Sequence, residues 1–206
     1  DGAAPWFGLP ARLPEREALI LPAQVNYVGK GINLFDAGYA WHGSASVILK
    51  HLRTGYLWEK VRVQGGAYGC MCGLDRMSGA FFMVSYRDPN ILPTLAVYDA
   101  AAEHLAGQTI GRAELEAAIV GAIGELDSYL LPDAKGSAAF VRHLCGDTED
   151  LRSRLREEIL GTTASHFKEF GRALQAFSAK GRVCALGGGT LERAAAEQGW
   201  HTEKVM

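Results

Sequence analysis

Two apolar runs joined by a short polar segment restrict the fold of this chain more than any other feature. Residues 67–74 and 80–87 have strand-like composition, and residues 75–79 between them supply turn residues. This pattern predicts a β-hairpin. The second run is apolar on both faces, which predicts a central strand of a sheet.

Strand and helix patterns alternate in the flanking parts of the chain. Residues 16–28 alternate apolar and polar side chains, which predicts one half-buried strand. Gly29, Gly31 and Gly38 then predict a loop. Apolar residues at helical spacing predict an amphipathic helix over 42–56.

Helical spacing dominates the second half. Asp88-Pro89 predicts the start of a helix, with Asp88 as its N-cap. The further predicted elements are helices over about 111–128, 151–160 and 163–178, a strand over 182–186, a glycine turn at 187–189 and a helix over 191–198 capped by Thr190.

A hairpin followed by a group of helices favours an α+β fold, with a largely antiparallel sheet flanked by helices. The 206 residues suit one domain, which we expect over 16–206. Residues 1–15 carry Pro5, Pro10 and Pro14 and are expected to form a linker. The chain begins with Asp1 and not with Met, so we expect a piece of a longer protein.

Composition excludes several classes of partner. The net charge is -2 and no basic run is present, so a nucleic-acid partner is not expected. No apolar stretch is long enough to cross a bilayer, so a membrane partner is not expected either. Four cysteines in a chain of this length do not predict a disulfide framework. A reducing compartment follows, and the bacterial cytoplasm is the expected location, with an organelle as the alternative for a eukaryotic source.

One segment, Leu57-Trp58-Glu59-Lys60-Val61-Arg62-Val63-Gln64-Gly65-Gly66-Ala67-Tyr68-Gly69, resembles the C-terminal half of pitrilysin/insulinase-family peptidases. The presequence-protease branch is the most similar. Residues 21–29, 85–90 and 133–136 agree in the same order, the last placed after a helix, and the resemblance extends from about Leu19 to Leu186. It implies a pitrilysin/processing-peptidase-like α+β domain.

Members of this family are zinc proteases that close around a chamber, and their N-terminal half holds zinc through a His-x-x-Glu-His motif. The six histidines of this chain never show that spacing with a Glu. The resemblance therefore implies zinc in the full-length enzyme and none bound by this domain. It also implies two partners, the N-terminal catalytic half of the same protein and short unstructured peptide substrates. This chain alone is expected to be inactive.

Five residues are the candidate site. The resemblance assigns Arg62 and Tyr68 to catalysis, because the family projects an Arg and a Tyr from this half toward the reacting peptide. A phenol can donate to an oxyanion, and a guanidinium offers a planar set of donors to carbonyls. Gly65 and Gly66 leave the main chain open to an extended peptide. Asn26 lies on the polar face of the predicted first strand and is a candidate to bind substrate or a partner domain.

Two other functions stay open. The chain would also suit a non-catalytic interaction module of a peptidase-like complex. An independent enzyme with Cys70 or Cys72 as nucleophile lacks an assignable His or acid. Cys70 and Cys72 are expected on one strand face together with Tyr68, as two small buried apolar side chains. Residues 187–190 lack the Lys of a phosphate-binding loop, so a simple turn is expected there.

Overall fold

The computed structural model describes residues 13–205 of the chain, so most of the predicted linker lies outside the described residues. The strands are β1 (Arg16–Ile20), β2 (Asn26–Asn33), β3 (Gly69–Leu74), β4 (Ala80–Asp88), β5 (Arg182–Gly187) and β6 (His201–Lys204). The helices are α1 (Ser44–His51), α2 (Leu92–Gly107), α3 (Arg112–Leu126), α4 (Pro132–Leu144), α5 (Glu149–Leu160), α6 (Ala164–Lys180) and α7 (Gly189–Gln198). Two wider, π-type helical segments, η1 (Leu52–Tyr56) and η2 (Trp58–Gln64), continue α1.

All six strands form one sheet in the order β3-β4-β2-β5-β1-β6. The pairs β3–β4, β4–β2 and β2–β5 are antiparallel, while β1 runs parallel to both β5 and β6. The predicted α+β class and antiparallel hairpin are confirmed. The sheet itself is mixed. Five helices separate β4 from β5, and a connection of this length lets β5 lie parallel to β1.

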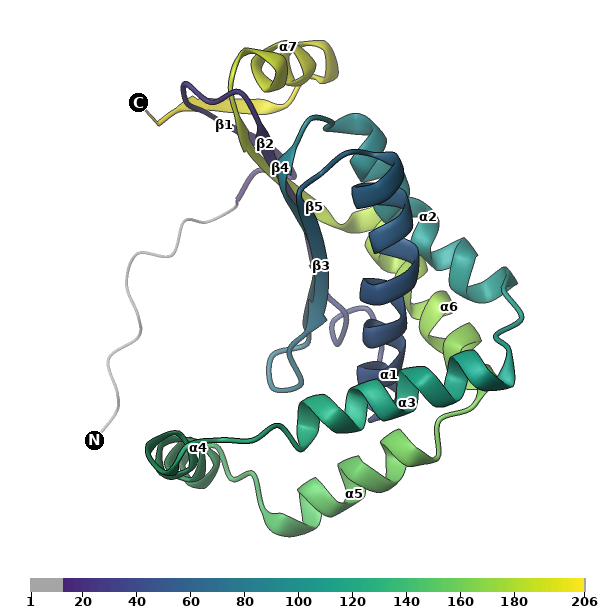
Figure 1. Cartoon of the computed structure of the whole chain (residues 1–206). Coiled ribbons are helices and arrows are strands. Elements are labelled where there is room, and N and C mark those ends of the chain that lie inside the picture. Colours follow the sequence, from purple (N-terminus) through teal and green to yellow (C-terminus); the bar gives the residue numbers. More distant parts are fainter. Residues whose placement is uncertain (1–12, 206) are drawn as a thin grey trace.

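Helices gather on one side of this sheet. In Figure 1, α1, α2 and α6 lie against the same face, and α3, α4 and α5 extend from one end. Phe81 and Met83 of β4 point into this helical layer and are fully buried. The ring of Phe81 meets that of Phe177 on α6 edge to face, with centroids 4.9 Å apart. The opposite face of the sheet is not covered by any helix of the described residues.

Four predictions of local structure were wrong in ways that matter for the site. The expected strand over 16–28 is two strands, because the chain leaves the sheet at Leu21 and re-enters it at Asn26. Gly29 and Gly31 lie within β2 and not in a loop. The helix predicted to end at Tyr56 continues to Gln64. Asp88 ends β4 and is buried, while α2 begins at Leu92.

Other differences lie away from the site. Residues 133–136 follow helix α3, as predicted, but lie within a further helix, α4. This helix was not predicted, and none of its residues is buried, so no apolar stripe marks it in the sequence. Strand β6 was also not predicted, because its four residues are polar and exposed. The N-cap of α7 is Gly188 and not Thr190.

Candidate functional site

Arg62 lies in the last turn of the long helix formed by α1, η1 and η2. In π-type turns the hydrogen bonds run from residue i to i+5, and such turns are frequent at functional sites. This winding places the Arg62 guanidinium over the ring of Trp58, 4.0 Å from its centroid. The guanidinium carbon also lies 5.9 Å from the Tyr68 ring. Arg62 is thus an exposed cation oriented by two aromatic rings.

Gly65 and Gly66 turn the chain from this helix into β3. Gly66 has a φ of 79°, in the left-handed region that favours glycine. A Cβ at Gly65 would lie 2.6 Å from the carbonyl oxygen of Val61. The side-chain amide of Asn90 donates to the Gly65 carbonyl at 2.6 Å and anchors the turn. Both glycines are therefore required by the turn itself, and their predicted contact with substrate stays a prediction.

Tyr68 sits in the bend that precedes β3, with 58% of its surface exposed. Its ring packs edge to face on Tyr86, with centroids 5.5 Å apart. The guanidinium carbon of Arg87 lies 5.6 Å from the same ring, so two arginines flank one phenol. The structure therefore brings Arg62 and Tyr68 together, and it adds Arg87, which the sequence reasoning did not single out.

Asn26 does not lie on an exposed polar face. Its side chain is 3% exposed and donates to the carbonyl oxygen of Asp88 at 3.0 Å. The side-chain oxygen faces the α carbon of Gly187, where a Cβ would come within 2.3 Å of it. The predicted polar face was wrong, because Asn26 begins β2 at a buried point between β4 and β5.

Buried polar groups organise the chain next to Asn26. The Asp88 carboxylate accepts from the hydroxyls of Ser85, at 2.6 Å, and Thr94, at 2.8 Å. It also accepts from the backbone amide of Asn90 at 2.8 Å. This carboxylate therefore fixes the connection from β4 to α2, and through Asn90 it holds the Gly65 turn beneath Arg62.

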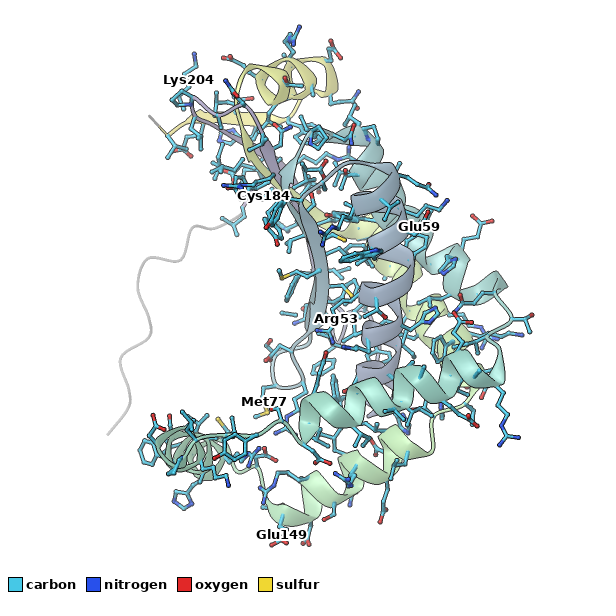
Figure 2. All side chains as sticks on the ribbon, in the orientation of Figure 1. Arg53, Glu59, Met77, Glu149, Cys184 and Lys204 are labelled. Carbon is cyan, nitrogen blue, oxygen red and sulfur yellow. The ribbon has the colours of Figure 1, made fainter. Side chains whose placement is uncertain are left out.

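The helix-free face of the sheet is apolar beside Tyr86. Tyr27, Met71 and Phe82 are partly exposed on it. A hollow of about 640 Å³ is lined there by Leu19, Tyr27, Val28, Gly29, Met71, Val84, Ser85, Tyr86, Cys184 and Leu186. Cys184, labelled in Figure 2, projects from β5 on the side away from the helices. Tyr68 stands at the rim of this apolar surface through its contact with Tyr86.

The thiols of β3 do not form a reactive site. Cys72 is buried on the helical side, where its sulfur approaches the carbonyl of Leu49 at 3.7 Å. Burial raises the pKa of Cys72 to about 12 and that of Cys70 to about 11. Both thiols stay protonated near neutral pH, which disfavours them as nucleophiles. Tyr68 does not share their face, since it precedes the strand and contacts Tyr86 instead.

Phenol and guanidinium groups surround Tyr68, and they are not zinc ligands. The residues at this site therefore do not fit a zinc ion. Within residues 13–205 one group of side chains has the donor types and spacing for a cation: Glu17, His201 and Glu203, with ligand atoms within 4.8 Å of one another. It lies on β1 and β6, at the opposite edge of the sheet from β3, and is mostly exposed. No helix of the described residues is long and apolar enough to cross a bilayer.

The fold is that of pitrilysin-type M16 peptidase domains. The peptidase M16 inactive domain from Pseudomonas fluorescens superposes with a TM-score of 0.64 at 17% identity, covering 91% of this chain and 47% of that one. The crystal structure of pitrilysin superposes with a TM-score of 0.62 at 12% identity, covering 92% of this chain and 21% of that one. At these identities the likeness establishes the fold.

Sequence comparison then places the chain within this class. Residues 16–186 match the PreP C-terminal domain, and the chain belongs to this family. Presequence protease 1, chloroplastic/mitochondrial, of Arabidopsis thaliana is 48% identical over 186 residues, which cover 90% of this chain. The match spans only 17% of the length of that relative. The family recognised from residues 57–69 is thereby confirmed.

Proposed function

We propose that this chain is the substrate-binding C-terminal domain of a zinc metalloendopeptidase that degrades short unstructured peptides. In this proposal Arg62 and Tyr68 complete a site whose zinc is held by the N-terminal half of the same protein. One observation carries the proposal: Arg62 and Tyr68 lie together, exposed, at the rim of an open apolar sheet face. Relatives with this domain as a small part of a longer protease support it.

The chemistry assigned to each side chain follows from its donors. Attack on a peptide carbonyl turns its oxygen into an oxyanion, and the Tyr68 hydroxyl donates a hydrogen bond to it. Donors preoriented toward developing charge stabilise the transition state more than the ground state. Arg62, held over Trp58, keeps its charge at any working pH and donates to neighbouring peptide carbonyls.

The open sheet face suits an extended and partly apolar peptide. Tyr27, Met71 and Phe82 offer apolar contacts along it. Gly65 and Gly66 add no side chain beyond the main chain, so a peptide strand can approach closely. Asn26 supports this surface indirectly. Its hydrogen bond holds the end of β4, and its side chain does not touch the peptide.

The test compares this domain alone with the domain joined to its upstream half. We expect the isolated chain to hold no zinc and to leave a quenched fluorescent peptide uncleaved. The joined protein should hold zinc and cleave, and Arg62→Ala should lower kcat/KM by about 100-fold or more while zinc content stays unchanged. Cleavage by the isolated, zinc-free chain would contradict the proposal.

A non-catalytic role is the second candidate. The Pseudomonas fluorescens domain with this fold is named as an inactive peptidase domain, which supports a role without chemistry. A joined protein that holds zinc and cleaves equally well with Arg62→Ala and Tyr68→Phe would support this interpretation. The predicted bacterial cytoplasmic location stays a prediction, since the Arabidopsis relative is named as chloroplastic and mitochondrial.

A further inference from the structure

Strand β4 contains a bulge immediately before its last residue. Asn26 pairs with Asp88, and Val28 pairs with Ser85. One residue of β2, Tyr27, therefore faces two residues of β4, Tyr86 and Arg87. A bulge of this kind bends its strand and redirects a side chain, and bulges are common next to active sites.

Arg87 occupies the strained position of this bulge. Its φ is 49°, and it is the one non-glycine residue with a positive φ in the described part of the chain. Glycine takes this conformation without steric cost, whereas a side chain with a Cβ does not. Strained residues of this type persist where the surroundings hold them and concentrate at functional sites. Two features hold Arg87 in this conformation: the Asn26–Asp88 hydrogen bond and the hydrogen bonds of the buried Asp88 carboxylate.

The bulge determines where the Arg87 guanidinium points. Phe81, Met83 and Ser85 alternate onto the helical side of β4, so regular alternation would bury Arg87 as well. Because of the extra residue in the bulge, Asp88 takes this buried position and Arg87 is exposed. The Arg87 carbonyl accepts the Tyr68 amide at 3.3 Å, and its guanidinium lies against the Tyr68 ring.

Within the described residues, neither arginine beside Tyr68 forms an ion pair with a carboxylate. None of the ion pairs formed among residues 13–205 includes Arg62 or Arg87. The nearby carboxylate of Asp88 is buried and occupied by three hydrogen bonds. Two exposed guanidinium groups flanking one phenol create a local positive potential that attracts an anionic group.

We propose that Arg87 is a second substrate-contacting guanidinium, which binds a carboxylate of the peptide beside Tyr68. The proposal rests on the proposed function and specifies one of its subsites. A guanidinium matches a carboxylate with two parallel hydrogen bonds, which neither a lysine nor the phenol provides. The carboxylate is either the peptide's C-terminus or an Asp or Glu side chain, since both offer the same oxygens.

The test uses the full-length protease with three variants. Arg87→Ala removes the guanidinium and keeps the backbone strain, Arg87→Gly removes both, and Arg87→Lys keeps the charge without the planar donors. Arg112→Ala on α3 is the control, since this side chain is 92% exposed and pairs only with Glu116. Two pairs of fluorogenic peptides separate the sources of the carboxylate: free C-terminus against C-terminal amide, and Glu against Gln beside the cleaved bond.

We expect KM for the carboxylate-bearing member of one pair to rise by about tenfold in Arg87→Ala and Arg87→Gly alike. The kcat should stay within about twofold, and the uncharged member should be cleaved as by the wild type. Arg87→Lys should give an intermediate KM, and added salt should shrink the difference between wild type and variants.

A purely structural role for Arg87 predicts another pattern. Arg87→Ala and Arg87→Gly, which both remove the packing of the guanidinium on the Tyr68 ring, would then lose activity on charged and uncharged peptides equally. That result would overturn the proposal. Failure of the proposed function would appear separately, as full activity in Arg62→Ala and Tyr68→Phe.

Discussion

The side-chain amide of Asn26 and the carbonyl oxygen of Asp88 lie 3.0 Å apart, joining the first residue of β2 to the last residue of β4. Both residues are buried, at 3% and 0% exposure. The bond closes the β4 bulge on the side away from Tyr68. A residue expected on a polar surface thus supports the backbone that carries Arg87.

Asn26→Ala should destabilise the 206-residue chain by about 1–3 kcal/mol, because a buried carbonyl loses its donor. Urea unfolding followed by circular dichroism measures this change. Gln24→Ala is the control, since Gln24 is exposed two residues earlier, and it should stay within about 0.5 kcal/mol of the wild type. A direct substrate role for Asn26 predicts instead an unchanged stability and a raised KM in the full-length protease.

Glycine-to-alanine substitutions should destabilise the protein more in the turn beneath Arg62 than in the helix that precedes this turn. Gly66→Ala should cost about 1–2 kcal/mol, because its φ of 79° is left-handed. Gly65→Ala should cost at least as much, since its Cβ would meet the Val61 carbonyl at 2.6 Å. Gly55→Ala, in open space on η1, should be neutral or stabilising. Thermal unfolding of the three variants measures these losses of stability. Equal losses for all three would contradict the conclusion that the turn requires glycine.

The four thiols should react at very different rates. At pH 8, iodoacetamide should modify exposed Cys145 first and Cys184 more slowly, because partial burial and then Glu17 raise the pKa of Cys184. Cys70 should react later still, and Cys72 only as fast as the chain opens. Peptide mapping by mass spectrometry gives the order. Rapid labelling of Cys70 would restore the cysteine-nucleophile alternative.

The Cys72 thiol also makes the free energy of unfolding depend on pH in the alkaline range. Its folded-state pKa of about 12 lies above the ordinary value of 9.0, so the unfolded chain ionises first. The stabilisation from the neutral buried thiol is present below pH 9 and is lost as pH rises toward 12. Cys72→Ala should therefore flatten the decline of the urea midpoint between pH 9 and pH 11. An unchanged decline would exclude this thiol as its source.

Local patterns were sufficient to predict the elements whose contacts are close in sequence. The β3–β4 hairpin follows from strand periodicity and from turn residues such as Asp75, whose carboxylate accepts from Ser78 at 2.7 Å. Helices α3 and α6 follow from their apolar stripes. Asp88 misled the helix assignment because its carboxylate does accept an amide two residues later, from Asn90, as a capping side chain would. The helix begins further on, at Leu92.

Long-range pairing was not predictable in the same way. The alternation of residues 16–28 continues through Leu21–Val25, so periodicity alone does not reveal that two strands flank β5. The bulge at Arg87 exists only through pairing with β2, about sixty residues away in sequence. Arg62 and Tyr68 were found by resemblance. Arg87 lies within the matching segment 85–90, but the resemblance assigned it no role, and its place beside Tyr68 required the structure.

Tyr68→Phe is the sharpest test of the site, because it removes one hydroxyl and leaves the ring between Arg62 and Arg87. In the full-length protease kcat should fall by about 100- to 1000-fold, the usual loss for one oxyanion donor. KM should change little, since the ring contacts with Tyr86 and both guanidinium groups remain. Tyr129→Phe makes the same chemical change at a phenol that is 81% exposed between α3 and α4, and it should keep wild-type turnover. A kcat for Tyr68→Phe equal to that of Tyr129→Phe would show that the phenol does not stabilise the transition state. Arg62 and Tyr68 would then contribute to substrate binding only.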